Sequence, residues 1–230
     1  MVNQMKALAI GLILLGSVSS TLGVEKAELD RRIRMLTAKF EALQHKPDKS
    51  IPAEQLRKAQ GIVLLDRTKA GFVFAFQGGG GVALVKDAKS QWSPVAFLDA
   101  HEASLGFQVG GEHSFFVILF LSTNATQLLT EPNITFGGEA RGTAGDASTG
   151  AEGNVSPLEL SVLVYDDRRG LYGGAAIKGG AITPDDDANH LYYGQFVTMK
   201  EILFEKKVKP TESATELAAK ITEYSKDAKK

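Results

Sequence analysis

Apolar residues recur along the chain with two different spacings. At each end they return every three or four positions, which is the spacing of one face of a helix. In the first segment, residues 25–46, the apolar positions are Leu29, Ile33, Leu36, Phe40 and Leu43. In the second segment, residues 211–226, they are Leu217, Ile221 and Tyr224. The spacing predicts an amphipathic helix near each end of the folded chain.

Between these helices lie short apolar runs that are rich in β-branched and aromatic residues and are separated by glycine. Such runs predict antiparallel strands joined by turns. The expected strands fall into three groups: 61–65, 71–76 and 82–85; 104–111 and 115–121; 162–165 and 170–179. We therefore predict an α+β fold, an antiparallel sheet arranged as a barrel or a sandwich, with helices at both chain ends.

The run Gly78–Gly81 is a candidate for a phosphate-binding loop or for a turn. A phosphate-binding loop places a lysine and then a serine or threonine after its last glycine, at the start of a helix. Here Val82 follows and continues a strand pattern. We interpret the four glycines as a hairpin turn that needs positive φ angles, and we expect no bound nucleotide.

Other residues mark the ends of shorter elements. Pro47 ends the first helix. Ser50 is expected to cap a second helix that has Pro52 in its first turn. Asp185–Asp187 is expected at the start of a later helix, because helix N-termini favour acidic side chains. The weakly apolar, glycine-rich passage over residues 134–154 suggests short strands joined by a mobile loop at 146–152.

Composition narrows the classes of function. The 230 residues carry a formal net charge of -1, so the overall charge offers no attraction for nucleic acid. Cysteine is absent, which excludes disulfides, thiol nucleophiles and cysteine-ligated metals. Any attraction to an anionic surface must therefore come from a local group of basic residues.

Residues 1–23 have the pattern of a secretion signal. Lys6 precedes the apolar run Ala7–Leu15, and small residues follow. The run is shorter than the roughly 20 residues that a membrane span needs. We predict a signal peptide over residues 1–23, with an uncleaved anchor as the alternative. A single domain over residues 24–230 is then expected in the periplasm or secreted.

Patterns for metal binding and catalysis are incomplete. His101 and Glu102 begin a zinc-protease motif, but Leu105 stands where the second histidine belongs. Asp185–Asp187 lacks the alternating acids of a calcium loop, and a calcium bridge to lipid headgroups stays only as an alternative. Ser104 has no surrounding nucleophile motif. We expect no metal, no cofactor and no enzymatic activity.

An ordered series of short motifs resembles the SYLF domain family. It covers roughly residues 28–221 and consists of Ile51-Pro52, Ala59–Ile62, Lys69–Phe72, Gly79–Val82, Trp92–Pro94, Ser104–Gly110, Tyr165, Arg169–Gly174, Gly179 and Asn189–Gly194. Two features depart from the resemblance. Eukaryotic relatives usually add an SH3 or FYVE domain, for which we expect no room in these 230 residues, and Gly145-Asp146 stands where the family tends toward Gly-Pro.

The resemblance implies a non-catalytic module that binds phospholipid membranes, with phosphoinositides as ligands in several eukaryotic members and actin in some fungal ones. Given the predicted secretion signal, actin is an unexpected partner. Peripheral association with an anionic phospholipid membrane of a bacterial envelope is the expected role. The alternative is a structural module that binds another envelope protein.

Basic residues of the first helix and its neighbours are the candidates for lipid contact. Each lysine or arginine near an anionic leaflet contributes about 1 kcal/mol. Four to six of them would outweigh the net charge of the chain locally. The predicted lipid-binding residues are Arg31, Arg32, Arg34, Lys39, Arg57, Lys58 and Lys69.

Overall fold

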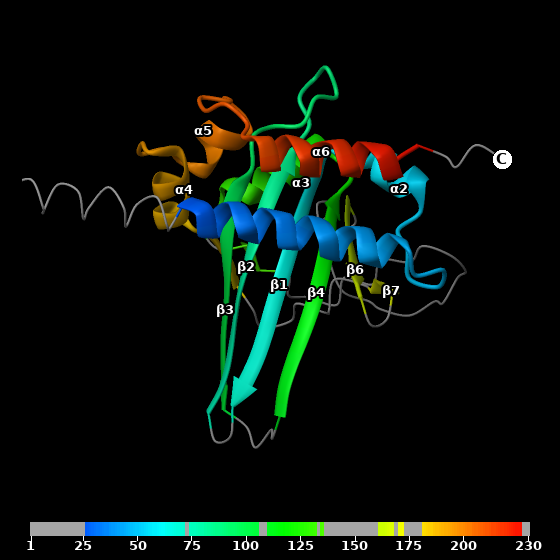
Figure 1. Ribbon diagram of the computed structural model, residues 1–230, viewed down its shortest axis with the longest axis vertical. Coiled ribbons are helices and arrows are strands. Elements are labelled where there is room, and N and C mark those ends of the chain that lie inside the picture. The colour runs from blue at the N-terminus through cyan, green and yellow to red at the C-terminus, as the bar shows by residue number, and fades with distance from the viewer. Residues whose placement is uncertain are drawn as a thin grey trace, which may run out of the picture.

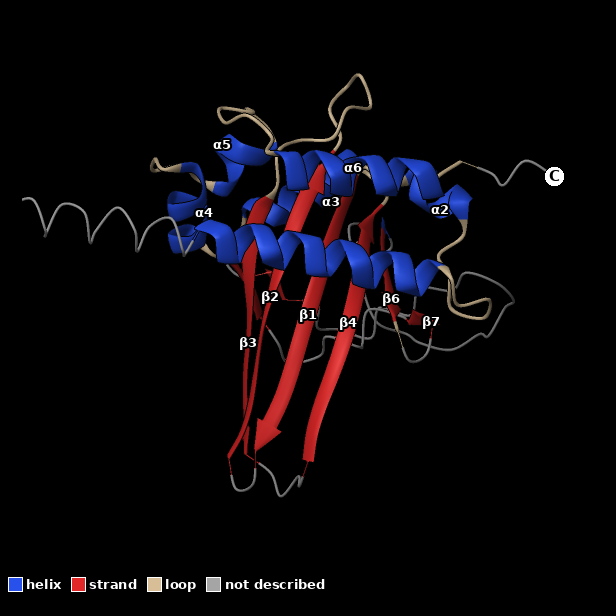
Figure 2. Cartoon of the chain, in the orientation of Figure 1, coloured by secondary structure: helices blue, strands red, loops and turns tan. Residues whose placement is uncertain are grey.

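The computed structural model describes residues 26–71, 74–105, 110–132, 134–135, 161–167, 170–172 and 181–226. Within these ranges, one eight-stranded antiparallel sheet lies between helices on its two faces (Figures 1 and 2). None of the helices in these ranges is long and apolar enough to cross a bilayer. The predicted signal peptide, residues 1–23, lies outside the described residues.

The sheet has four long central strands and four short outer ones, in the order β5-β8-β3-β2-β1-β4-β6-β7. The strands are β1 (Gly61–Gly71), β2 (Phe74–Val85), β3 (Ala96–Leu105), β4 (Gly110–Phe120), β5 (Ile134–Thr135), β6 (Val162–Asp166), β7 (Gly170–Tyr172) and β8 (Ala181–Pro184). The predicted α+β class is confirmed. Over the described residues the sheet does not close into a barrel, because its edges are the two-residue β5 and the three-residue β7.

Helices cover both faces of the sheet. They are the N-terminal helix (residues 26–44), α2 (Ala53–Lys58), α3 (Thr123–Thr126), the 3-10 helix η1 (Gln127–Thr130), α4 (Asp186–Tyr193), α5 (Met199–Leu203) and α6 (Glu212–Tyr224). The N-terminal helix and α6 lie side by side on one face (Figure 1), and Lys220 of α6 pairs with Glu41 at 2.8 Å. The two helices predicted at the chain ends are confirmed.

The alternation of side chains along the strands produces two separate cores. In β1, Ile62 and Leu64 point into the core beneath the N-terminal helix and α6, whereas Leu65 points into the core on the opposite face. Successive side chains of a strand face opposite sides of its sheet. The central strands are therefore apolar on both faces, and both faces need a helical cover.

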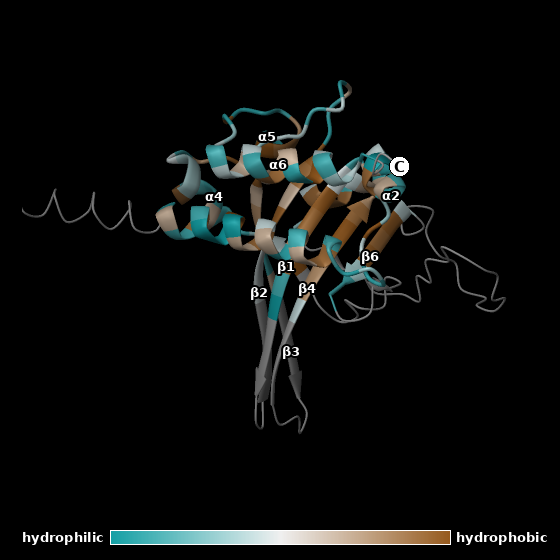
Figure 3. Ribbon diagram, turned by 45° about the vertical axis from the view of Figure 1, so that its right-hand side comes forward, coloured by the Kyte–Doolittle hydropathy of each residue, from teal (hydrophilic) through white to brown (hydrophobic). Residues whose placement is uncertain are grey.

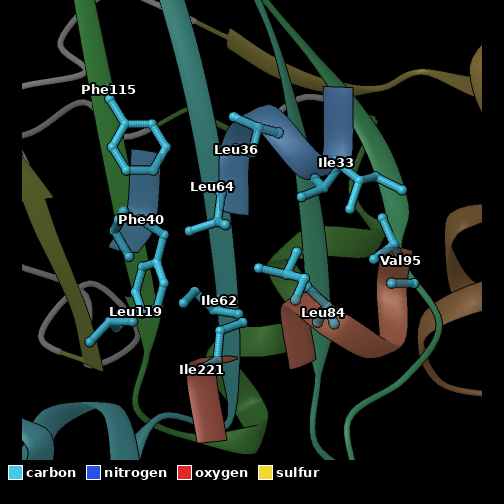
Figure 4. Packing of buried hydrophobic residues seen from close by; sticks show 14 of the residues in the cluster. Ile33, Leu36, Phe40, Ile62, Leu64, Leu84, Val95, Phe115, Leu119 and Ile221 are labelled. Atoms are coloured by element: carbon cyan, nitrogen blue, oxygen red, sulfur yellow. The ribbon is translucent and has the colours of Figure 1, made fainter. Parts of the chain in front are cut away.

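The predicted apolar stripe of the N-terminal helix is buried against β1, β2 and β4 (Figure 4). Its five residues are 0–6% exposed. Burying one large apolar side chain contributes roughly 1.5–3 kcal/mol, so the stripe holds the helix firmly on the sheet. Figure 3 shows the complementary pattern, with apolar strands behind helices whose outer surfaces carry polar residues.

The glycine run is strand and not turn, so the predicted hairpin at Gly78–Gly81 is wrong. These residues lie within β2, where Gly79 pairs with Arg67 of β1. Glycine is needed there for a different reason: a Cβ at Gly79 would lie 2.1 Å from the carbonyl oxygen of Asp66. The close approach of two backbones explains the missing side chain.

Two further expectations are corrected. Ser50 does not cap α2, because the helix begins later and Pro52 is its N-cap residue. Gln44 instead accepts a hydrogen bond from the Ile51 backbone nitrogen at 2.7 Å. The strand expected over residues 104–111 is divided between β3 and β4. The loop expected at 146–152 lies outside the described residues.

Candidate functional site

A buried polar network fixes the N-terminal helix to α4 and α6. The carboxylate of Asp30 accepts hydrogen bonds from the Tyr192 hydroxyl and the Ser213 hydroxyl, both at 2.6 Å. The Tyr192 hydroxyl also lies 2.6 Å from that of Thr211, the N-cap residue of α6. Burial, reinforced by the Asp30 carboxylate, raises the pKa of Tyr192 to about 12. The helix is therefore held by directional contacts as well as by its apolar stripe.

The outer face of the N-terminal helix carries an exposed methionine, Met35, beside two exposed arginines. Met35 is 42% exposed, and it is one of the two large hydrophobic residues exposed in the described part of the chain. The side chains of Arg31 and Arg34 are 70% and 56% exposed. This combination of a flexible apolar side chain and guanidinium groups suits contact with a lipid surface.

The ion pairs of these two arginines are weak. Arg31 pairs with Glu28 on the same helix, and Arg34 lies 3.9 Å from Glu216 of α6. Ion pairs between exposed side chains contribute only about 0–1 kcal/mol. An anionic ligand can therefore displace either carboxylate at little cost.

Arg32 and Lys39 point toward the sheet instead. They stand seven positions apart, so they lie on the same flank of the helix. The Arg32 guanidinium is 3.5 Å from Asp185 and lies over the Phe97 ring. The Lys39 ammonium donates to Asp66 at 2.6 Å. Both side chains join the helix to the sheet.

The remaining predicted residues lie away from this face. Lys58 pairs with Glu54 within α2 at 2.6 Å, and Arg57 donates to the carbonyl oxygen of Ser225. Lys69 belongs to β1, but its side chain is outside the described residues. The structure thus brings together Arg31 and Arg34 on one surface, and it separates them from Arg57 and Lys58.

Two lysines outside the predicted set converge just after the N-terminal helix. The ammonium groups of Lys46 and Lys49 donate to the same backbone oxygen, the carbonyl of Asp167, at 3.1 and 3.4 Å. Within the described residues, neither ammonium lies within 4.0 Å of a carboxylate. Lys46 lines a cavity of about 110 Å³ together with Lys39, Asp66 and Asp167. Lys49 reaches the edge of this cavity through the Asp167 carbonyl oxygen.

This convergence has almost no signal in the sequence. Pro47 marks a turn after the helix, which brings Lys46 and Lys49 near each other. The group that they contact is more than one hundred residues further along the chain. Only the pairing of β4 with β6 brings Asp167 to this position.

The acidic run at residues 185–187 begins a helix, as predicted. Asp185 is the N-cap residue of α4, and its side chain accepts from the Ala188 backbone nitrogen at 2.9 Å. No group of three or more potential metal ligands occurs in the described ranges. Ser104 lies in β3, and its side chain is outside the described residues. The basic residues are therefore the candidates on which a binding function rests.

Comparison with known proteins gives a consistent family. The Ysc84 family, described as "Las17-binding protein actin regulator", matches residues 101–224. The SH3 domain-containing YSC84-like protein 1 of Bos taurus is 31% identical over 169 residues, which are 73% of this chain and 50% of that protein. The LAS seventeen-binding protein 3 of Saccharomyces cerevisiae is 31% identical over 160 residues, 68% of this chain and 35% of that protein.

The shared region is limited to part of each relative. The Xenopus laevis SH3 domain-containing YSC84-like protein 1 is 32% identical over 73% of this chain and 51% of its own length. The chain therefore spans about half the length of the vertebrate relatives that it matches. No solved structure matches the chain.

Proposed function

The chain belongs to the Ysc84 family, whose domain is also called SYLF, and from this premise we propose that it is a non-catalytic module that binds anionic phospholipid membranes. The observation that carries the proposal is the outer face of the N-terminal helix, where Arg31, Arg34 and Met35 are exposed together. Given the pattern of residues 1–23, the membrane is one outside the cytoplasm.

The mode of binding follows from the packing of the helix. The apolar stripe is already buried against the sheet, so lipid contact uses the opposite face and leaves the fold intact. Each arginine near an anionic leaflet contributes about 1 kcal/mol, and insertion of Met35 adds an apolar contribution. Attraction of this size gives a peripheral, reversible association that weakens as salt rises.

Vesicle sedimentation tests the proposal. The test variant is Arg31→Glu with Arg34→Glu, and the charge-matched control is Lys89→Glu with Lys209→Glu, two exposed lysines in connecting loops. Arg32 is left unchanged, because its side chain is only 30% exposed and packs against Asp185 and the Phe97 ring, so its replacement would change the fold as well as the charge. We expect the test variant to lose binding to phosphatidylglycerol vesicles at low salt, and the control to retain at least half of it.

Thermal unfolding of both variants should stay within a few degrees of the wild type, because all four side chains are exposed and exposed ion pairs contribute little. If the wild-type protein ignores phosphatidylglycerol vesicles at low ionic strength, lipid binding is rejected. If the two variants lose binding equally, the outer face of the helix is rejected as the site.

Protein binding is the second candidate function. It is favoured by the names of the relatives, since the family description and the yeast protein both refer to Las17 binding, and the description also names actin regulation. Co-sedimentation with actin filaments separates the two candidates. Binding to filaments that persists in the Arg31→Glu, Arg34→Glu variant, without binding to vesicles, would favour the protein partner.

A further inference from the structure

The cavity beside Lys46 lies where the end of the N-terminal helix meets β4 and the turn between β6 and β7. Figure 1 shows this end of the helix beside β6 and β7. The lining combines ammonium groups with carboxylates and with Ser114. Of the predicted lipid-binding residues, only Lys39 lines this cavity. The outer-face residues Arg31, Arg34 and Met35 and the polar network around Asp30 are not part of its lining.

The arrangement of charges favours an anion. Two ammonium groups share one uncharged carbonyl oxygen, so their nitrogens are no farther apart than the sum of 3.1 and 3.4 Å. A lysine after a helix often neutralises the last carbonyls of that helix, but these two reach across to Asp167. Like charges held this close repel one another, and an anion between them relieves the repulsion.

A second observation indicates that the ligand also carries a hydrogen-bond donor. The Oδ2 atom of Asp66 accepts from Lys39, while its Oδ1 atom is buried and has no hydrogen-bond partner among the described residues. A buried acceptor without a donor is destabilising, and a hydroxyl group is a suitable donor. Asp167 is already engaged, since its Oδ1 atom accepts from the Phe115 backbone nitrogen.

We propose that this cavity binds a phosphate ester that carries a neighbouring free hydroxyl, as in a glycerol phosphate group. Lys46 and Lys49 contact the phosphate, and Asp66 accepts from the hydroxyl. The volume of about 110 Å³ is several times that needed for one water molecule, and it suits a small polar headgroup. The inference deepens the proposed function, because such an ester is either a free metabolite or the headgroup of an anionic lipid.

Titration of the labelled full chain by NMR with sn-glycerol 3-phosphate and with inorganic phosphate tests the site. We expect saturable shifts of the amides of Ala42, Ser114 and Asp167, with tighter binding of the glycerol ester. In Lys46→Ala with Lys49→Ala, the Kd should rise at least tenfold. The charge-matched control, Lys89→Ala with Lys209→Ala, should keep the wild-type Kd.

The Asp66→Asn variant tests the hydroxyl contact. In this variant, the Kd for glycerol 3-phosphate should rise toward the Kd for inorganic phosphate, because the contact with the hydroxyl is weakened. An unchanged preference in a folded variant would overturn the role of Asp66. Equal loss of binding in the two lysine variants, or no saturable binding by the wild type, would overturn the site.

The source of the ester is decided with vesicles. If the wild type binds soluble phosphatidylglycerol with the same amide shifts, and the Lys46, Lys49 variant binds vesicles more weakly, the ligand is a lipid headgroup. If vesicle binding is unchanged in that variant while soluble ester binding is lost, the site takes a free phosphate ester. The Arg31→Glu, Arg34→Glu variant should still bind soluble glycerol 3-phosphate with the wild-type Kd. Failure of the membrane proposal can therefore be told apart from failure of the cavity proposal.

Discussion

The guanidinium group of Arg32 lies directly over Gly80, in the middle of the central sheet. A Cβ atom at position 80 would come within 3.0 Å of the Arg32 Nη1 atom. The glycine therefore leaves room for the arginine to pass beneath the helix and reach Asp185. Contact between helix and sheet depends at this point on the absence of a side chain.

Substitutions at the two neighbouring glycines should differ sharply. In Gly80→Ala the new methyl group meets the far end of a flexible side chain, so we expect a loss of about 1 kcal/mol. In Gly79→Ala it meets the Asp66 carbonyl, and the loss should exceed about 3 kcal/mol. Urea unfolding measures both. Equal losses would contradict the close backbone approach at Gly79.

Because of the network around Asp30, the free energy of unfolding should decrease at acidic pH. Burial raises the pKa of Asp30, but hydrogen bonds from Ser213 and Tyr192 outweigh this effect and hold the pKa below its ordinary value of 3.8. The ionised carboxylate therefore stabilises the fold fully above pH 3.8, and the contribution is lost as the pH falls through the lower, folded pKa. Asp30→Asn should cost about 1–2 kcal/mol at pH 7, measured by urea unfolding.

The difference between Asp30→Asn and the wild type should shrink as the pH falls below 3.8. Asp48→Asn is a suitable control, because Asp48 is an exposed acid in the turn after the N-terminal helix. A difference that stays constant from pH 7 to pH 3 would show that the charge of Asp30 does not contribute.

Tyrosine ionisation should destabilise the fold in alkali. Burial raises the pKa of Tyr192 from 10.0 to about 12, with a further contribution from Asp30. Between these values the unfolded chain releases the proton and the folded chain keeps it, so stability falls as the pH rises from 10 toward 12. Tyr192→Phe should remove part of this slope, and it should cost about 1–2 kcal/mol at pH 7 through lost hydrogen bonds.

Tyr165 offers the matched control for Tyr192. Burial alone raises its pKa to about 12. Tyr165→Phe should reduce the alkaline slope in the same way but leave stability at pH 7 nearly unchanged. The two effects are separated by urea unfolding at pH 7 and pH 11, and a large neutral-pH loss in Tyr165→Phe would contradict this assignment.

Substitutions on the two faces of the N-terminal helix should separate stability from vesicle binding. Phe40 is fully buried and packs edge-to-face with Tyr224 at a ring separation of 5.8 Å, so Phe40→Ala should cost about 3–5 kcal/mol. Met35→Ala should leave stability within about 0.5 kcal/mol but weaken vesicle binding. Phe40→Ala should not weaken the binding of the folded fraction. The reverse pattern would mean that the apolar stripe contacts lipid.

The elements at both chain ends could be predicted because their information is local. The spacing of Leu29, Ile33 and Leu36 defines a buried helical face, and Asp185 indicates a helix start through its own side chain. Both signals lie within a few residues of the structure that they specify. The family motifs, spread over most of the chain, were sufficient to identify its family.

The predictions for Gly78–Gly81 and Ser50 were wrong because the neighbouring sequence does not determine the structure at these positions. Four glycines are compatible with a tight turn or with strands in close contact, and the choice depends on the Asp66 carbonyl of the neighbouring strand. Ser50 is an adequate cap by residue type, but Pro52 occupies the cap position, and the preceding backbone is bonded to Gln44. In each case the local structure is determined by a residue of another element, Asp66 of β1 or Gln44 of the N-terminal helix.

By itself, the sequence determined which segments are amphipathic, where charge is concentrated and which family the chain resembles, because periodicity and motif order are properties of neighbouring residues. Only the tertiary structure decided where each basic side chain points. It turned Arg32 and Lys39 onto the sheet, left Arg31 and Arg34 outside, and brought Lys46 and Lys49 to Asp167. The reason is physical: a charge acts on the groups near it in space, and strand pairing sets which groups those are.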